Sequence, residues 1–264
     1  MSGPLEGRVA VITGAGGDIG GAAAAILAER GASVVAVDVN TAGLAALLER
    51  LPAGAKAISV EADVSDESAV AGYVAKAAEA FGGGIDFFFN NAGIEGSRTG
   101  AWKAITQLSL ADFRQIMDVN AKGVFFGLKH VLPVMAERGR GAIVNTSSIW
   151  GIKGNRNQVA YVASKHAVWA MTMTAAKEWA ARGIRVNAIA PGAIQGRMLR
   201  DFSAIIRENS PPPDPSRPAR YNPPPFPRWS DPREIAEVAC FLLSDEASYV
   251  TGACYSVDGG LSAI

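Results

Sequence analysis

The stretch Val9-Ala-Val-Ile-Thr-Gly-Ala-Gly-Gly-Asp-Ile-Gly20 decides the fold of this chain. Its first five residues are uncharged and suit a buried β-strand, and the alanine-rich segment near 19–30 suits a helix. A glycine turn between a strand and a helix lets backbone N–H groups approach a pyrophosphate, and the helix N-terminus adds a partial positive charge. Glycines also serve simple tight turns, so the position of this turn gives it its weight.

The same alternation of strand and helix continues along the chain. Further strands are expected at Ser33–Asp38, Ala57–Val60, Ile85–Phe89, Ala142–Thr146 and Arg185–Ile189, and further helices near 41–51, 66–81, 109–137, 159–182 and 231–244. Strands that are continuous apolar runs are typical of a parallel sheet covered on both faces. We therefore predict an α/β fold with a single doubly wound parallel sheet of the Rossmann type, helices on both faces, and one domain over residues 1–264.

Composition excludes several classes of protein. Hydrophobic residues make up 49% of the 264 residues and charged residues 19%, which indicates a globular chain. Lys+Arg 25 balances Asp+Glu 25, so no nucleic-acid footprint is expected. No apolar run reaches membrane-spanning length, and strand-like sequence begins by Arg8, so we expect a cytoplasmic protein without a membrane partner. Cys240, Cys254, His130 and His166 have no metal-ligand spacing, and no metal is expected.

Residues 195–230 interrupt the regular alternation. Nine prolines lie between Pro211 and Pro227, and such a segment cannot join a sheet. A long insertion in a compact domain is usually a functional lid or a disordered loop. Phe202, Tyr221 and Trp229 give it apolar groups with which to dock. We predict a partly ordered lid over the substrate, with a loose surface loop as the alternative.

Asp38 ends the second expected strand, 18 residues after Gly20. A carboxylate at this place can accept both hydroxyls of an adenosine ribose, and it would repel a 2′-phosphate. Two like charges at about 4 Å cost about 4 kcal/mol at an effective dielectric of 20. No Lys or Arg in the glycine turn or just after Asp38 reverses this effect. The sequence therefore favours NAD over NADP as cofactor.

Tyr161-Val-Ala-Ser-Lys165 places a phenol and an ammonium one helical turn apart, on one face. This pair suits proton transfer to and from an alcohol oxygen, although by itself it is common on solvated helix faces. Ser148 lies 13 residues earlier and can donate to a developing alkoxide. Its neighbour Ser147 is the rival for that role.

At this point the chain resembles a short-chain dehydrogenase/reductase of the compact branch. The motifs follow the family's order, from Thr13 to Gly20, then Asp63-Val64, Asn90-Asn-Ala-Gly93, Asn120, Ser148, Tyr161 with Lys165, and Pro191-Gly192. The family's spacing decides for Ser148 over Ser147. The resemblance also implies a homotetramer or homodimer, built through the helices near 109–137 and 159–182.

The resemblance implies a role for each matched position. Asp63 and Val64 would contact adenine, and Ile194 would touch the nicotinamide amide. The other implied cofactor-binding residues are Gly14, Gly17, Asp18, Ile19, Asp38, Asn90, Ala92, Gly93, Tyr161, Lys165, Pro191 and Gly192. Asn91 is expected to satisfy backbone groups instead. The implied catalytic residues are Asn120, as a helix kink that holds a water near Lys165, with Ser148, Tyr161 and Lys165.

Two positions depart from the compact branch. Asp18 stands where that branch usually has glycine, and the spacing of Gly14, Gly17 and Gly20 fits the family's longer branch. We expect Asp18 to cap the first helix with its side chain turned away from phosphate. Gly196 stands where a threonine commonly bonds the nicotinamide amide or phosphate, so the lid must anchor the nicotinamide differently or less tightly.

The expected chemistry is hydride transfer between a secondary alcohol and its ketone, with Tyr161 as general base or acid. An ammonium at about 4 Å would lower the phenol's pKa by at most roughly three units. Glu95, Trp150 and Gln158 are the candidate substrate contacts, and a medium-sized cyclic or aromatic substrate is preferred. The alternatives are an NADP-preferring carbonyl reductase, a nucleotide-sugar epimerase or dehydratase of the longer branch, and a catalytically silent NAD-binding regulator.

Overall fold

A computed structural model describes residues 3–96, 99–198, 200 and 225–263 of the chain. Its centre is one seven-stranded sheet in the order β3-β2-β1-β4-β5-β6-β7, and every pairing is parallel. The strands are β1 (Val9–Thr13), β2 (Ser33–Asp38), β3 (Ala57–Glu61), β4 (Phe87–Asn90), β5 (Gly141–Thr146), β6 (Ile184–Pro191) and β7 (Cys254–Val257). The predicted doubly wound α/β fold is confirmed.

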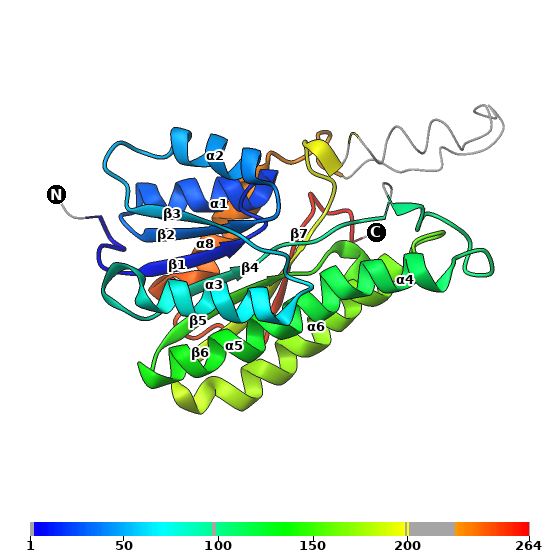
Figure 1. The fold of residues 1–264 in the computed structure, drawn as a ribbon. Helices are drawn as coiled ribbons and strands as arrows, with labels where there is room; N and C mark the ends of the chain where they lie inside the picture. The colour runs from blue at the N-terminus through cyan, green and yellow to red at the C-terminus, as the bar shows by residue number, and fades with distance from the viewer. Residues whose placement is uncertain (1–2, 97–98, 199, 201–224, 264) are drawn as a thin grey trace.

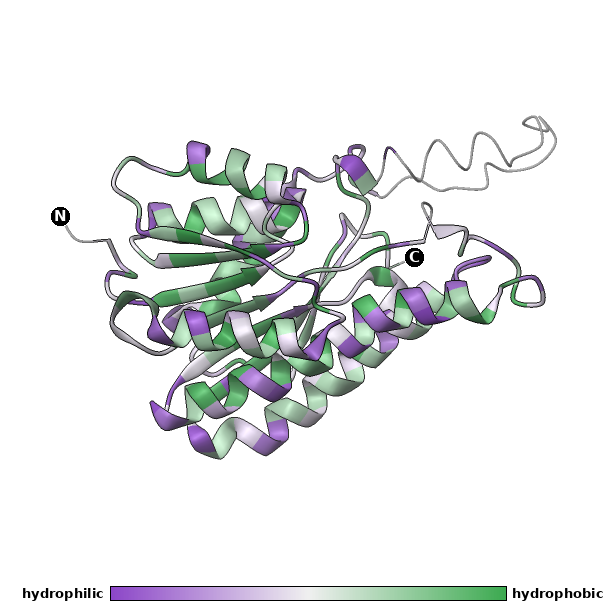
Figure 2. Ribbon diagram, viewed as in Figure 1, coloured by the Kyte–Doolittle hydropathy of each residue, from purple (hydrophilic) through white to green (hydrophobic). Residues whose placement is uncertain are grey.

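Helices cover both faces of the sheet (Figure 1). They are α1 (Asp18–Glu29), α2 (Thr41–Arg50), α3 (Glu67–Glu79), α4 (Leu110–Met117), α5 (Gly123–Glu137), α6 (Val159–Trp179) and α8 (Pro232–Leu243). One core joins the sheet to α1, α2 and α8, and a second joins it to α3, α5 and α6. The inner strands are accordingly mostly apolar and coloured green in Figure 2, because both of their faces are covered, whereas the edge strands β3 and β7 are partly exposed.

The order of the strands places a crevice between β1 and β4. The chain builds outward from β1 through β2 to β3, then crosses back and builds from β4 to β7 on the other side. The connections that leave the carboxyl ends of β1 and β4 therefore diverge, and ligands of such sheets bind where they do so. None of the helices in the described ranges is long and apolar enough to cross a lipid bilayer.

The segment near 109–137, predicted as one helix with a kink at Asn120, is helical from Leu110 to Glu137 in three consecutive parts. Residues Asp118–Lys122 between α4 and α5 form a π-type turn. The side chain of Asn120 in this turn accepts a hydrogen bond from the Ile94 N–H and donates one to the Ile94 carbonyl. These two bonds tie the helix to the segment after β4. Such a widened turn inside a helix often marks a functional site. The other predicted helices begin and end within three residues of the observed ones.

The predicted lid lies mostly outside the described residues. Its two ends are described, and they meet: Ile194 pairs with Ser230 in a parallel bridge, and the Gln195 N–H donates to the Ser230 carbonyl at 2.8 Å. Ser230 lies two residues before α8 and next to its N-cap, Asp231. Residues 194–195 are thereby fixed beside the amino end of that helix.

Candidate active site at the carboxyl edge of the sheet

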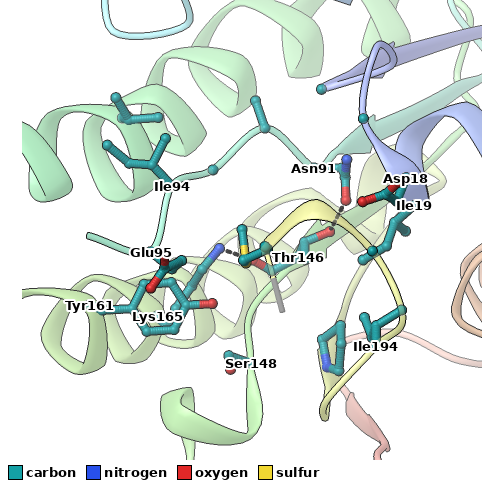
Figure 3. A pocket seen from close by; sticks show the side chains of 18 of the residues that line it. Asp18, Ile19, Asn91, Ile94, Glu95, Thr146, Ser148, Tyr161, Lys165 and Ile194 are labelled. Atoms are coloured by element: carbon teal, nitrogen blue, oxygen red, sulfur yellow. Dashed lines mark hydrogen bonds between the residues drawn. The ribbon is translucent and has the colours of Figure 1, made fainter. Parts of the chain in front are cut away.

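A pocket of about 470 Å³ opens at the carboxyl edge of the sheet, at the crevice between β1 and β4. Most of the predicted site residues line it. They are Gly14, Gly17, Asp18, Ile19, Asp38, Asp63, Val64, Ala92, Gly93, Glu95, Ser148, Trp150, Gln158, Tyr161, Lys165, Pro191, Gly192 and Ile194. Figure 3 shows that Asp18 and Ile19 lie at one end and Glu95, Tyr161 and Lys165 at the other.

The glycine turn forms one end of the pocket. Gly14 has φ +69°, which favours glycine, and a Cβ on Gly20 would overlap the Gly14 carbonyl. Gly17 is the N-cap of α1 and supplies no side chain to bond the first N–H groups of the helix. Those N–H groups are available to an anion at this end of the pocket.

Asp18 does not cap α1, contrary to the prediction. It is the first residue of the helix, and its carboxylate accepts a hydrogen bond from the Arg197 N–H at 2.9 Å. Its side chain therefore faces the segment after β6 and not the helix end. The expectation of a cap fails because the partner is 179 residues away in the sequence.

Two carboxylates line the pocket where β2 and β3 end. The oxygens of Asp38 accept hydrogen bonds from the N–H groups of Gly16 and Asn40, each at 2.9 Å. Each carboxylate oxygen can accept a second bond, so Asp38 keeps acceptor capacity toward the pocket. Asp63 accepts from Ser65 at 2.8 Å and is fixed in the same way.

Asn90 and Asn91 hold the end of β4. Asn91 donates to the Thr13 carbonyl and accepts from the Thr146 hydroxyl, each at 3.1 Å, so it satisfies neighbouring strands as expected. Asn90 is buried, does not line the pocket, and donates to the Val124 carbonyl at 3.1 Å. This bond holds the end of β4 against α5, and the implied contact of Asn90 with a cofactor stays a prediction.

Asn120 also lies behind the pocket wall. It accepts from the Ile94 N–H and donates to the Ile94 carbonyl, both at 2.8 Å, and it donates to the Ser164 hydroxyl at 3.1 Å. A Cβ on Gly93 would lie 3.2 Å from both the Asn120 Oδ1 and the Lys165 Nζ. Asn120 therefore fixes the wall segment directly beside the lysine.

Ser148, Tyr161 and Lys165 meet at the opposite end of the pocket (Figure 3). Tyr161 has a hydrogen bond with Ser148. The Lys165 ammonium donates to the Thr146 carbonyl at 2.8 Å and lies 5.7 Å from the centre of the Tyr161 ring. The Ser147 hydroxyl donates to the Lys165 carbonyl at 2.9 Å, so it has a backbone role and leaves Ser148 as the serine of the site.

Burial reverses the predicted shift of the tyrosine's pKa. Removal from water raises the pKa of Tyr161 to about 12, against the smaller lowering effect of the bond with Ser148, and the negative charge of Glu95 raises it further. Burial also lowers the pKa of Lys165 to about 8. The direction is opposite to the expected drop, because desolvation is the largest influence on the pKa of the phenol. Tyr161 is a phenol at neutral pH here.

The substrate candidates lie around these groups. Glu95 lies beside Tyr161 in Figure 3, and Trp150 and Gln158 line the same pocket. The amide oxygen of Gln158 is held by Asn155. The structure adds Gln115, Val119 and the segment Gln195–Met198 to the lining. The i, i+4 spacing of Gln115 and Val119 could have indicated a shared face.

The fold and the pocket define an oxidoreductase of the class that binds a nicotinamide dinucleotide at the switch point of a doubly wound sheet. A family model described as enoyl-(acyl carrier protein) reductase matches residues 14–262. The chain belongs to the short-chain dehydrogenase/reductase family, and its relatives act on alcohols.

Three known proteins illustrate the likeness. Levodione reductase of Leifsonia aquatica is 43% identical over 97% of this chain and 94% of its own. Cyclohexanol dehydrogenase of an Acinetobacter species is 37% identical over 98% of this chain and 96% of its own. The crystal structure of NAD⁺-bound xylitol dehydrogenase has a TM-score of 0.86 and 35% identity, over 97% of this chain and 100% of that one.

Proposed function

We propose that this protein transfers hydride between NAD and a cyclic secondary alcohol or its ketone. The observation that carries the proposal is one pocket with Asp38 and the glycine turn at one end and Ser148, Tyr161 and Lys165 at the other. The first end suits the adenosine and diphosphate of a dinucleotide. The second end suits the proton transfer that must accompany hydride transfer.

The residues present fit the cofactor. Gly17 leaves the first N–H groups of α1 open toward the diphosphate, and no side chain at Gly14 or Gly20 obstructs it. Asp38 would accept from the adenosine ribose, Asp63 and Val64 would border adenine, and the lysine would bond the second ribose. A bound nicotinamide supplies the acceptor or donor of hydride. In this proposal Ala92, Gly93, Pro191, Gly192 and Ile194 form its walls.

Proton handling falls to Tyr161. As a phenol it donates its proton to the carbonyl oxygen during reduction, and Ser148 donates a second hydrogen bond to that oxygen. Oxidation needs the reverse transfer, which a pKa of about 12 opposes at neutral pH. Further positive charge near the phenol would favour that transfer, and an oxidised nicotinamide would add such a charge to the Lys165 ammonium 5.7 Å from the ring.

The preference for NAD over NADP rests on Asp38. Its carboxylate is fixed by two backbone N–H groups at the end of β2 and cannot easily turn away from a 2′-phosphate. The xylitol dehydrogenase that the fold resembles is described as NAD⁺-bound, which supports the same choice. Among the described pocket-lining residues, the basic ones are Lys165 and Arg197, and neither adjoins Asp38 in sequence.

A six-membered ring alcohol is the proposed substrate class. Cyclohexanol dehydrogenase is named for such a ring, and it matches nearly the whole chain. Ile94, Ile149 and Trp150 line the pocket near Tyr161 and give it apolar walls. Glu95 adds an acceptor that suits a second hydroxyl or a ring polar group.

Turnover with cyclohexanol and substituted cyclohexanols, followed by the absorbance of reduced nicotinamide, tests the proposal. Tyr161→Phe should remove turnover and leave the dissociation constant of NAD within about twofold of the wild-type value, because the phenol acts on the substrate oxygen. Unchanged turnover in this variant would sink the assignment. NAD binding without turnover on any carbonyl or alcohol of the panel would favour a silent regulator.

We also propose that the protein is a homo-oligomer, a dimer or tetramer, formed through α5 and α6. Phe125 on α5 is half exposed and Met173 on α6 is partly exposed, although both helices pack into the core with their other faces. Exposed apolar side chains on such helices suit a protein contact. Light scattering on the purified protein gives the mass, and Phe125→Lys should lower it if the face is used.

A further inference from the structure

The two positions that depart from the compact family pattern contact each other. Asp18 begins α1, and Gly196 lies in the segment after β6, yet a Cβ built on Gly196 would overlap the Asp18 carboxylate. The next residue, Arg197, donates its backbone N–H to that carboxylate at 2.9 Å. The aspartate and the glycine are therefore a matched pair, since a side chain at 196 could not occupy this arrangement.

The pair holds a short piece of chain, Ile194–Met198, which we call the strap. On one side the strap is joined to Ser230 through Ile194 and Gln195, in front of α8. On the other side it is joined to Asp18 at the amino end of α1. Because α1 and α8 pack together in one core, the strap is bonded at both ends to the same rigid part of the fold. The strap lines the pocket.

The strap also brings a positive charge to the pocket. The lining contains the acids Asp18, Asp38, Asp63 and Glu95, and among the described lining residues its bases are Lys165 and Arg197. Lys165 is engaged with Thr146 at the Tyr161 end. Arg197 is exposed, lines the pocket and donates its backbone N–H to Asp18, the first residue of α1. A diphosphate at the glycine turn needs such a partner, because the Asp18 charge beside it is repulsive.

We propose that Asp18 and Gly196 form a clasp that positions the strap, and that the clasp presents Arg197 to the diphosphate of a bound dinucleotide. Asp18 is a positioning residue in this view, and Arg197 is a cofactor contact. The inference rests on the proposed dinucleotide-binding function but not on the choice between NAD and NADP, since both carry the diphosphate. It also gives a role to the threonine position that this chain has replaced by glycine.

Binding affinity measured by calorimetry tests the clasp. Asp18→Asn and Asp18→Ala both remove the charge, but only the asparagine keeps an oxygen that can accept from the Arg197 N–H. Asp18→Ala should bind NAD about three- to tenfold more weakly than Asp18→Asn, the range that one hydrogen bond supports. Asp18→Asn should bind at least as tightly as wild type, because it also removes the repulsion.

Gly196→Ala tests the clasp at its second residue. Alone it should weaken NAD binding as much as Asp18→Ala does, because its methyl displaces the carboxylate. In the double variant with Asp18→Ala, Gly196→Ala should change the NAD affinity little. The carboxylate is then absent, and a Cβ on residue 196 would lie an ordinary 3.4 Å from the Asp18 Cβ. Additive losses in the double variant would overturn the pairing.

Arg197→Gln tests the contact itself, with Arg200→Gln as its control one helical turn away and outside the pocket lining. Arg197→Gln should weaken NAD and ADP-ribose about three- to fivefold, leave adenosine unchanged, and reduce the salt dependence of binding. The clasp is refuted if NAD binds with equal affinity to three variants, Asp18→Ala, Asp18→Asn and Arg197→Gln. In that case binding of NAD by the wild-type protein still upholds the proposed function. Wild-type protein that binds neither NAD nor NADP would refute the function instead.

Discussion

Asn120→Ala should destabilise the protein and slow its chemistry together. The wild-type side chain is fully buried and makes three hydrogen bonds, two with Ile94 and one with Ser164. At about 0.5–1.5 kcal/mol for each bond, the loss is about 2–4 kcal/mol, and the cost of the cavity adds to it. For a domain of this size each kcal/mol lowers the melting temperature by about 2–4 °C, so a drop of roughly 5–15 °C is expected.

Asn90→Ala is the matched control. It deletes the same side chain from another buried site, where a single hydrogen bond to Val124 is lost. The cavity costs of the two variants are similar, so their difference reports about two hydrogen bonds, roughly 1–3 kcal/mol. Denaturant unfolding at one protomer concentration measures both values.

The kinetic effect should also be specific to Asn120. Ile94 directly precedes Glu95, and Ser164 directly precedes Lys165, so loss of these bonds loosens both sides of the reactive centre. We expect kcat to fall on the order of ten- to hundredfold in Asn120→Ala and much less in Asn90→Ala. The reasoning is refuted if the two variants agree within about 0.5 kcal/mol in unfolding free energy and have the same kcat.

Three further outcomes follow from the charges of the site. Glu95→Gln removes a charge that raises the pKa of Tyr161, so the pH profile of oxidation should move to lower pH; an unmoved profile contradicts the assigned contact. Between pH 8 and 10 the unfolded chain keeps the proton of Lys165 and the folded chain releases it, so the free energy of unfolding should rise with pH. Relative to Lys165→Met, the rise should be up to about 1.4 kcal/mol per pH unit. Parallel curves of unfolding free energy against pH for the two proteins would contradict the lowered pKa. Asp38→Asn should reduce the preference for NAD over NADP at least about tenfold, as thermal shifts with both cofactors would report, and an unchanged ratio would count against Asp38 as the selector.

Local sequence patterns predict many features of the fold and of the candidate site. The apolar runs predict the strands because each buried strand must be apolar along its own length. The glycine turn follows from its place between β1 and α1, and the helical spacing of Tyr161 and Lys165 places both on one side of α6. In the sequence, only the family resemblance favours Ser148 over Ser147 as the serine of the site. The structure supplies a physical reason, because the Ser148 hydroxyl bonds Tyr161 whereas the Ser147 hydroxyl bonds the Lys165 carbonyl.

Other features needed the tertiary structure. The resemblance implies a kink at Asn120, but the partners that hold its amide in the π-type turn, Ile94 and Ser164, lie on other parts of the chain. The pKa of Tyr161 could not be read from the distance to one lysine, since burial and the charge of Glu95 decide its direction.

The sequence by itself determined the doubly wound fold and the glycine turn, because each depends on neighbours within one strand, turn or helix, and it predicted the candidate reactive side chains. Only the tertiary structure decided what Asp18 and Gly196 do. Read separately, they are two unexplained departures from a family pattern. In the folded chain they are a carboxylate and the space that receives it, joined across 179 residues by the Arg197 N–H. Contacts of that range arise from the packing of α1 and α8 on one face of the sheet, which no local spacing encodes.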